Sequence, residues 1–360
     1  MRTIPVPRRR HFSDMINAMF TRRSTPLAAL AALVIATALL PAKNADPNNP
    51  TGNTGVVLID KVGHHIRFFD PKTWTETSNI AVGVNPHDIA LSPDHKTAYI
   101  PIYGAGIYGN NPNPEHTIAI VDLTSRSLAG TIDVSPYVAP HGIQIDAAGT
   151  LYVTCDASRK LLIIDPKTRT IRDAIDTEGT SHWAAVLPNA SKAYTVNKND
   201  RPFITVIDLK ARKVMGHISV PNGTEGIAAS PDGKRVLALD YTDPVLHVID
   251  PATDKIVDNV ALQGNEKAGS RVRFSPDGSK VVTDNSNQQL VNILSASDLH
   301  GKQLVVPVGK APMGMGFGPD NRTLIVGNHG DGSVSVIDMQ GGKELKRFQA
   351  GSGIETMTWY

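Results

Sequence analysis

The sequence predicts an all-β fold: a seven-bladed β-propeller with four-stranded blades and a C-terminal strand that closes the first blade. Three observations support this prediction. Short β-rich runs recur at a fixed period, tight-turn motifs recur in step with them, and the last strand-like segment has no later strands to follow it. Four short strands per period of about 40 to 45 residues are typical of propeller blades, whereas helical repeats show a 3.6-residue hydrophobic period, which is absent here.

The first observation is a series of β-rich runs such as IAIVD and LLIID, most of which end in aspartate. The last residues of these runs are Asp70, Asp122, Asp165, Asp208, Asp250, Ser295 and Asp338. The intervals between them are 52, 43, 43, 42, 45 and 43 residues. The repeat is therefore about 43 residues long and carries one insertion, in the first interval.

The second observation is a tight-turn motif, SPDG in its fullest form, that lies between two β-rich runs of each repeat. Proline presets the backbone for such a turn, and Asp, Asn and Gly tolerate it. Each repeat is therefore read as four strands, with the inner strand just before the turn. The predicted inner strands are residues 87–92, 141–146, 182–187, 225–230, 270–275 and 313–318.

The third observation concerns the two ends of the repeat region. Residues 354–360 fit the inner-strand pattern but have nothing after them, while residues 55–82 supply three strands with no inner strand before them. We therefore expect the two ends to complete one blade. Closing the ring in this way removes free sheet edges.

The repeat also carries a family resemblance. The segment SPDGKRVLALD, followed by LHVIDPATDKIVDNVAL, resembles the YVTN β-propeller repeat of YncE-like and surface-layer bacterial proteins, over roughly residues 54–360. The resemblance implies the propeller fold. It does not fix an activity, because such propellers include binding proteins and relatives of metal-dependent enzymes.

Residues 1–45 are predicted to be a signal peptide with a short spacer, and residues 46–360 a single propeller domain. Several arginines precede an uncharged stretch, residues 24–42, that is rich in Ala and Leu, which is the order of a secretory leader. We expect a periplasmic or secreted protein that starts near residues 43–46 and is free of the membrane. An uncleaved anchor is the alternative, since nineteen uncharged residues can just span a bilayer.

The charge of the chain argues against nucleic acid as its partner. Residues 1–43 hold seven of the 36 Lys and Arg and one of the 34 Asp and Glu, which leaves 29 basic against 33 acidic residues in the rest. A domain with this balance lacks the concentrated positive field that binding to a phosphate backbone requires. The chain has a single cysteine, Cys155, so it forms no internal disulfide.

The candidate site is the ring of residues at the start of the inner strands, where a propeller channel opens. The equivalent residues are His87, His141, His182, Glu225, Ser270, Met313 and Glu355. Imidazoles with one carboxylate are a ligand set for Zn, Fe, Mn or Cu, and the pseudo-symmetry of the ring aims these side chains at one point. The pattern predicts a divalent transition metal bound by His87, His141, His182 and Glu225, with a small molecule bound or transformed at the channel mouth.

Other interpretations remain open. The histidines could cap strands by hydrogen bonding to neighbouring backbone, or bind a ligand without metal. If the protein is an enzyme, which the sequence leaves uncertain, Glu225 is the candidate general base and Glu355 a candidate acid or base across the ring. The competing hypothesis is a non-catalytic interaction module whose rim loops bind a protein or an envelope polymer.

The insertion falls at residues 103–116, YGAGIYGNNPNPEH, after the second strand of the first histidine-bearing blade. Long loops on propellers often serve as functional lids, although a mobile glycine-rich excursion is the alternative. Tyr103, Tyr108 and His116 are candidates to cover the channel. Further polar residues are expected on the same face: Arg159, Lys198, Asp200, Arg201, Tyr241, Asp243 and His329.

Overall fold

The computed structural model describes residues 55–198 and 200–360, and all the regular structure in these residues is β-strand. The predicted leader, residues 1–45, lies outside them. No helix that is long and apolar enough to cross a membrane is found in the described residues.

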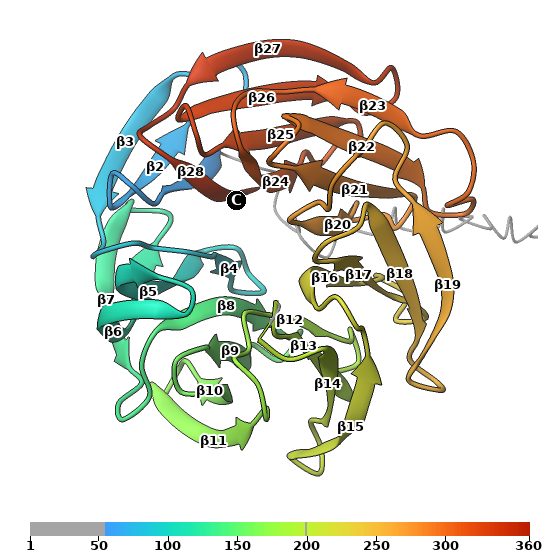
Figure 1. Cartoon of the computed structure of the whole chain (residues 1–360). Coiled ribbons are helices and arrows are strands. Elements are labelled where there is room, and N and C mark those ends of the chain that lie inside the picture. The colour runs from blue at the N-terminus through green and yellow to red at the C-terminus, as the bar shows by residue number, and fades with distance from the viewer. Residues whose placement is uncertain (1–54, 199) are drawn as a thin grey trace, which may run out of the picture. The chain divides into compact units, whose positions relative to one another are not determined.

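The described strands form seven four-stranded antiparallel sheets arranged as blades around a central channel (Figure 1). The inner strands are β28 (Ile354–Trp359), β4 (Ala90–Leu91), β8 (Pro140–Ile145), β12 (Trp183–Val186), β16 (Thr224–Ala229), β20 (Val272–Phe274) and β24 (Pro312–Phe317). The second strands are β1 (Val56–Asp60), β5 (Thr97–Ile107), β9 (Leu151–Cys155), β13 (Lys192–Val196), β17 (Val236–Asp240), β21 (Lys280–Asn285) and β25 (Thr323–Asn328).

The third strands are β2 (His65–Phe69), β6 (Asn110–Asp122), β10 (Lys160–Asp165), β14 (Phe203–Asp208), β18 (Val245–Asp250), β22 (Leu290–Ser295) and β26 (Ser333–Asp338). The outer strands are β3 (Glu76–Ala81), β7 (Ser127–Asp133), β11 (Thr170–Asp176), β15 (Lys213–Ser219), β19 (Lys255–Ala261), β23 (Leu304–Pro307) and β27 (Lys343–Gln349). The predicted seven-bladed propeller is thereby confirmed.

The two recurring motifs are turns held by their own polar side chains. Asp122, at the end of β6, accepts hydrogen bonds from the backbone amides of Thr124 (2.8 Å) and Ser125 (2.7 Å). In the SPDG turn at Ser230, the serine hydroxyl donates to Asp232 (2.6 Å), and Gly233 takes a positive φ of 69° that favours glycine. The period seen in the sequence is therefore the period of these turns.

The C-terminal strand closes the first blade, as predicted. β28 pairs with β1, with Trp359 opposite Val56 and Met357 opposite Leu58. The carboxylate of Asp60 fastens this junction, since it accepts hydrogen bonds from the backbone amides of Ser352 and Gly353, both at 3.0 Å. Phe68 and Tyr360 stack edge to face across the same junction, with 5.8 Å between ring centroids.

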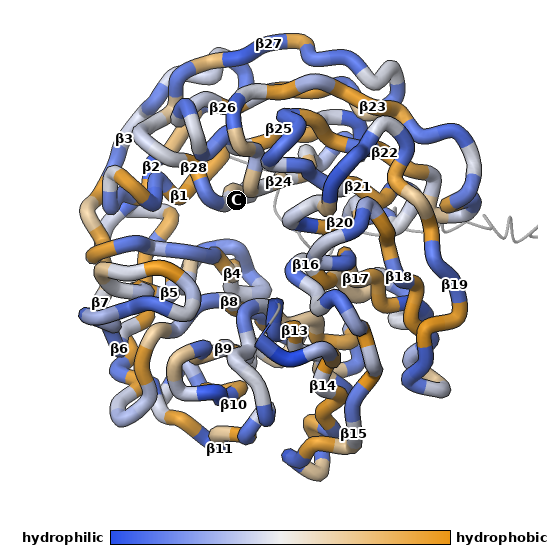
Figure 2. The backbone as a smooth tube through the Cα atoms, in the orientation of Figure 1, coloured by the Kyte–Doolittle hydropathy of each residue, from blue (hydrophilic) through white to orange (hydrophobic). Residues whose placement is uncertain are grey.

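The core lies between neighbouring blades. Second strands such as β9 are buried along their whole length, while outer strands such as β15 alternate between exposed and covered residues. Figure 2 shows this mixture of hydrophobic and hydrophilic residues along β15, β19 and β27. One hydrophobic cluster joins Ile118 of the second blade to Leu151 of the third, so each blade is stabilised by burying apolar surface against the next.

Two inner strands are reduced to three residues or fewer, and at their starts carboxylate side chains accept hydrogen bonds from backbone amides. The carboxylate of Asp88 accepts hydrogen bonds from the amides of Ile89 (2.9 Å) and Ile143 (3.1 Å), and β4 is reduced to Ala90–Leu91. The carboxylate of Asp284 accepts from the amides of Ser270 (3.1 Å) and Arg271 (2.8 Å), and β20 begins only at Val272.

Candidate functional site

The three histidines predicted from the sequence lie together at the mouth of the channel, which is the end where the inner strands begin. His141 is in β8, while His87 and His182 lie just before β4 and β12. The ring centroids of His87 and His141 are 4.4 Å apart, and those of His141 and His182 are 3.9 Å apart. We call these three residues the mouth cluster. All three are buried, with at most 4% of each residue exposed.

The hydrogen bonds of the cluster leave ring nitrogens available. Nδ1 of His87 lies 3.0 Å from the carbonyl oxygen of Asn85, and because a carbonyl only accepts, this nitrogen carries the proton. The Nε2 atom of a neutral His87 then has a free lone pair. The Nδ1 atoms of His141 and His182 are buried and make no hydrogen bond in the described part of the chain.

The imidazoles of the mouth cluster are neutral near neutral pH. Burial, reinforced by the nearby charge of Lys61, lowers the pKa of His87 to about 3. Burial also lowers the pKa of His141 and His182 well below the ordinary value, with the cations Lys198 and Arg271 adding to the effect. Neutral imidazole is the form that binds metal ions and accepts hydrogen bonds.

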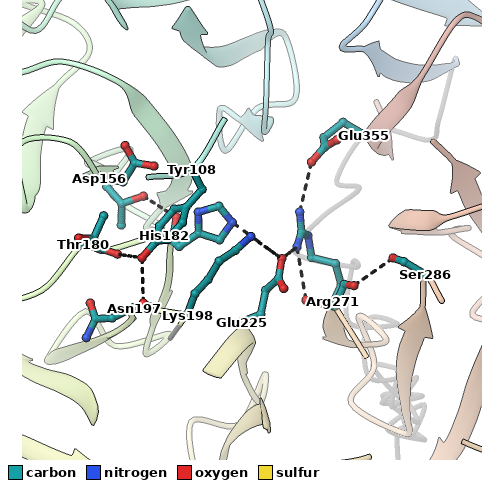
Figure 3. A network of polar contacts seen from close by, with 12 residues as sticks. Tyr108, Asp156, Thr180, His182, Asn197, Lys198, Glu225, Arg271, Ser286 and Glu355 are labelled. Carbon is teal, nitrogen blue, oxygen red and sulfur yellow. Dashed lines mark hydrogen bonds and ion pairs between the residues drawn. The ribbon is translucent and has the colours of Figure 1, made fainter. Parts of the chain in front are cut away.

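An ion-pair layer completes the mouth (Figure 3). Arg271 lies between two carboxylates, 3.3 Å from Glu225 and 3.2 Å from Glu355. Lys198 is 3.1 Å from Glu225, and Lys61 is 3.5 Å from Glu355. We use the name ion-pair layer for these five residues.

Glu355 is ionised in this layer. Burial by itself would raise its pKa, but the charges of Lys61 and Arg271, among others, hold the pKa of Glu355 at about 2. His329 adds a further contact, with its Nδ1 3.3 Å from the carboxylate. A carboxyl group with this pKa stays charged at physiological pH, so ion pairing is the role that the geometry gives it.

The insertion forms an ordered hairpin, which corrects the expectation of a loop. β5 and β6 extend beyond the blade and pair as far as Ile107 and Asn110. We call residues 103–116 the arm. The hydroxyl of Tyr108, near its tip, lies within hydrogen-bonding distance of the carbonyl oxygens of Thr180 (2.9 Å) and Asn197 (2.8 Å), in the next blade but one.

The arm covers the mouth cluster. The ring of Tyr108 packs edge to face on His182, with 4.6 Å between centroids, and the Nζ atom of Lys198 lies over the Tyr108 ring, 5.0 Å from its centroid. Tyr103 is buried in the root of the arm and donates a hydrogen bond to Asp156 (2.8 Å). His116 does not cover the channel as expected, because it is half exposed and pairs with Asp133.

A chamber of about 170 Å³ remains beneath the arm, and we call it the mouth chamber. The mouth cluster and the ion-pair layer line it, together with Ile107, Tyr108 and Met313. All five site residues predicted from the sequence therefore reach one space. No group of three or more His, Cys, Asp or Glu in residues 55–198 and 200–360 is arranged to hold a metal ion as the side chains lie. The planes of neighbouring imidazoles in the mouth cluster are tilted to each other by 53° and 38°.

Two cations of the site were missed in the sequence. Ser270 was expected at the start of its inner strand. Instead, the backbone amide of Arg271 donates a hydrogen bond to the carboxylate of Asp284, and the Arg271 side chain turns into the channel. The Ser270 hydroxyl is hydrogen-bonded to the hydroxyl of Ser286 (3.0 Å). The sequence did offer one signal for Arg271, because this charged residue directly follows the predicted first residue of an inner strand. Lys61 follows the first β-rich run and gave no signal of its own. Lys198 was expected only as one polar residue of this face.

Arg271 also packs against Trp183. Its guanidinium carbon lies 4.3 Å from the centre of the Trp183 ring, an arrangement in which the aromatic face attracts the cation. The same ring contacts His141 edge to face, at 4.7 Å between centroids. Trp183 thus connects the ion-pair layer to the mouth cluster.

Comparison with known proteins adds a family. Residues 145–358 match the cytochrome D1 heme domain family, a family of seven-bladed propellers. Of the mouth cluster, only His182 lies in the matched segment. A solved structure titled Kuenenia stuttgartiensis hydrazine synthase superposes with a TM-score of 0.63 at 20% sequence identity, covering 75% of this chain and 88% of that chain. At this identity the likeness concerns the fold alone. No curated protein matches the chain.

Proposed function

Since the chain belongs to the cytochrome D1 heme domain family, we propose that its channel mouth holds a transition-metal centre and binds a small molecule there. A heme contains iron, so the family favours iron among the four metals that the donor atoms suit, Zn, Fe, Mn and Cu. His87, His141 and His182 are the proposed ligands, with Glu225 as a fourth ligand or a general base.

The observation that carries this proposal is the burial of three neutral imidazoles from consecutive blades against one chamber. Structural caps would be expected to use both ring nitrogens in hydrogen bonds, yet the buried Nδ1 atoms of His141 and His182 have no such partner in the described chain. The carbonyl of Asn85 sets the tautomer of His87 in the way that outer-shell acceptors set metal-binding histidines. Rotation of the stacked rings is needed for their lone pairs to converge.

A complete tetrapyrrole does not fit the mouth chamber. The donors are suitable, because a histidine can ligate heme iron and the three cations could pair with carboxylate substituents. However, sites for drug-sized ligands have volumes of about 300–1,000 Å³, and the mouth chamber has about 170 Å³. The proposal therefore concerns the metal and a small ligand, and not the macrocycle.

The charge of the chamber suggests the class of the small molecule. Lys61, Lys198 and Arg271 face two carboxylates, which leaves one excess positive charge before any metal is bound. A bound divalent ion would increase this excess. A small anion or a polar neutral molecule is therefore favoured over a cation. If the small molecule is transformed, Glu225 is the proposed proton-transferring group. Glu355 is already ionised and held between cations, so its proposed part is limited to accepting a proton.

The proposed location is the periplasm or the cell exterior. This part of the proposal rests on the leader-like composition of residues 1–45 and on no structural observation.

Metal analysis of the purified protein tests the proposal. After incubation with Zn, Fe, Mn or Cu salts and removal of the excess, we expect one equivalent of bound metal in the wild type. His87→Ala, His141→Ala and His182→Ala should each lose it while melting within a few degrees of the wild type, because packing between blades holds the fold. His300→Ala removes a histidine exposed on the surface and is the matched control.

A parallel titration with hemin separates the metal from the macrocycle. We expect no stoichiometric shift of the hemin absorption band in the wild type. Wild-type protein that binds none of the four metals would overturn the proposal and favour the interaction-module hypothesis. Stoichiometric hemin binding that depends on His182 would instead show that the arm opens to admit a tetrapyrrole, contrary to the proposal.

A further inference from the structure

A second and larger chamber lies in the channel, toward the face where the inner strands end in their turns. It has a volume of about 580 Å³, and residues of the turns, including Pro93, Pro188 and Pro276, line its rim. We call it the channel chamber. Arg271 borders both chambers, so the ion-pair layer separates the channel chamber from the mouth chamber. Its volume lies within the range of about 300–1,000 Å³ that is usual for small-molecule sites.

The wall of the channel chamber is largely apolar. Partly exposed apolar residues line it from four blades: Ile89, Leu91, Val186, Ile227 and Phe317. These residues also contact the hydrophobic clusters between blades, which fixes their positions. A ligand in this chamber would therefore meet a preformed apolar surface.

Arg273 is the charged side chain of this wall whose guanidinium can still donate hydrogen bonds to a ligand. It lies two residues after Arg271, and because successive side chains of a strand alternate in direction, both face the channel. Its side chain is 39% exposed, and its closest charged neighbour is Asp88, at 3.7 Å. Asp88 already accepts hydrogen bonds from two backbone amides, those of Ile89 and Ile143. No hydrogen bond from the Arg273 guanidinium is found within the described residues.

The other charged groups of the lining are occupied. Arg271 is held by Glu225 and Glu355. Asp146 accepts hydrogen bonds from the amides of Ala148 and Thr150 and from the hydroxyl of Tyr152. Arg273 is thus left as an unsaturated guanidinium on an apolar wall, and a guanidinium binds carboxylates through two parallel hydrogen bonds.

We propose that the channel chamber binds a small amphipathic carboxylate, whose carboxylate pairs with Arg273 and whose apolar body lies against Ile89, Ile227 and Phe317. This site is separate from the proposed metal centre and would take a ligand of a different class. The polar end determines the orientation, and the burial of the apolar body supplies most of the affinity.

Calorimetric titration with octanoate tests this inference, with octan-1-ol as a probe that lacks the carboxylate. We expect one octanoate site in the wild type. Arg273→Gln should weaken octanoate binding about tenfold or more, because a charge-assisted hydrogen-bonded pair is lost. Octan-1-ol should bind the wild type and Arg273→Gln equally. Arg322→Gln makes the same change of charge at an exposed site outside the chamber and is the matched control.

Methyl NMR locates the site. Octanoate should shift the methyl signals of Ile89 and Ile227, which line the channel chamber, but not those of Ile107, which lines the mouth chamber. These shifts should persist in His182→Ala, so the outcome is independent of the metal proposal. Absence of octanoate binding, shifts only at Ile107, or unchanged affinity in Arg273→Gln would overturn the inference. If Arg273→Gln does not fold, Arg273→Met, which also removes the charge, replaces it, and unchanged octanoate affinity in that variant is the contradicting result.

Discussion

Arg271 is the residue on which both halves of the ion-pair layer depend. Its guanidinium neutralises Glu225 on one side and Glu355 on the other, and it packs on the face of Trp183. Glu355 is 2% exposed, so its charge has little access to water. A buried ion pair adds little net stability, but removing one partner leaves an uncompensated charge.

Lys61 still faces Glu355 and Lys198 still faces Glu225 when Arg271 is replaced. We therefore expect Arg271→Gln to lower the free energy of unfolding by about 1.5–3 kcal/mol, the usual value of hydrogen bonds to charged groups. The double variant Arg271→Gln, Glu355→Gln should regain part of this loss, because the buried carboxylate that lacks the charge of Arg271 is then removed as well. Urea denaturation of the wild type and the variants measures both values. Equal stability of the single variant and the wild type would show that Arg271 does not hold the layer together.

Asp60 gives the ring junction a dependence on pH. Burial alone would raise its pKa, but hydrogen bonds from the amides of Gly63, Gly353 and Ser352 and from Arg67 outweigh burial, so the pKa of Asp60 is lowered. A lowered pKa means that its stabilising effect is complete above the ordinary value of 3.8 and is lost as pH falls through the folded-state value.

Asp60→Asn should accordingly melt at a lower temperature than the wild type at pH 7, and the difference should shrink as the pH falls below about 4. Thermal melts between pH 3 and pH 7 measure this convergence. Asp298→Asn, a change at an exposed position, should follow the wild type throughout. A difference that is constant over this pH range would contradict the assignment to Asp60.

Among the structural elements, the arm shows what the sequence could and could not reveal. The 52-residue interval located the insertion, and the glycines suggested a loop. The alternation needed for long strands is weak in GAGIYGNNPNPEH, so its hairpin pairing could not be read locally. The position of the arm over the mouth depends on contacts of Tyr108 with two residues more than 70 positions away, Thr180 and Asn197, which no local pattern reports.

The inner strands show the same limit. The turn motifs located six of them, the inner-strand pattern of residues 354–360 located the seventh, and the first-position histidines lie together as the pseudo-symmetry predicted. Arg271 escaped prediction because the Asp284 cap shifts the start of β20 by side-chain hydrogen bonds from a different strand. Repeats therefore predict backbone positions well, while the irregular start of β20, which brings Arg271 into the site, depends on tertiary contacts.

Tyr108→Phe tests whether the tyrosine hydroxyl holds the arm down. Loss of the hydrogen bond from this hydroxyl to the backbone should destabilise the closed position of the arm by about 1 kcal/mol. This change corresponds to a roughly fivefold increase in the fraction of molecules whose arm is open. Hydrogen exchange of the amides in residues 104–114 should accelerate by that factor while the melting temperature changes little. Tyr137→Phe, a change outside the arm, is the control. Unchanged exchange in Tyr108→Phe would show that other contacts fix the arm.

At the scale of the whole molecule, the ring depends on its last strand. Deleting residues 354–360 removes β28, exposes the edge of β1 and takes Glu355 from the channel mouth. We expect the shortened chain to melt at a clearly lower temperature and to aggregate. Circular dichroism melts and light scattering measure these effects. A truncated protein that melts like the full chain would contradict the role of β28 in closure.

The leader makes a second prediction at this scale. We expect the mature protein to begin near residues 43–46 and to be recovered without detergent from the periplasm or the medium. N-terminal sequencing of the exported protein checks the position. Full-length protein that is released only by detergent would support the alternative of a membrane anchor.

The closing strand also determines when the protein can acquire its structure during synthesis. The carboxylate of Asp60 accepts a hydrogen bond from Gly353, which lies 293 residues later in the chain. At about 5–20 residues per second, the ribosome needs roughly 15–60 s to synthesise the chain between these two residues. Until then β1 presents an unpaired edge, and closing the ring is the most non-local step of folding. Because Glu355 arrives with the same strand, a chain that stops early lacks both the closed ring and a complete channel mouth. The channel mouth is thus completed only after β28 has been synthesised and has paired with β1.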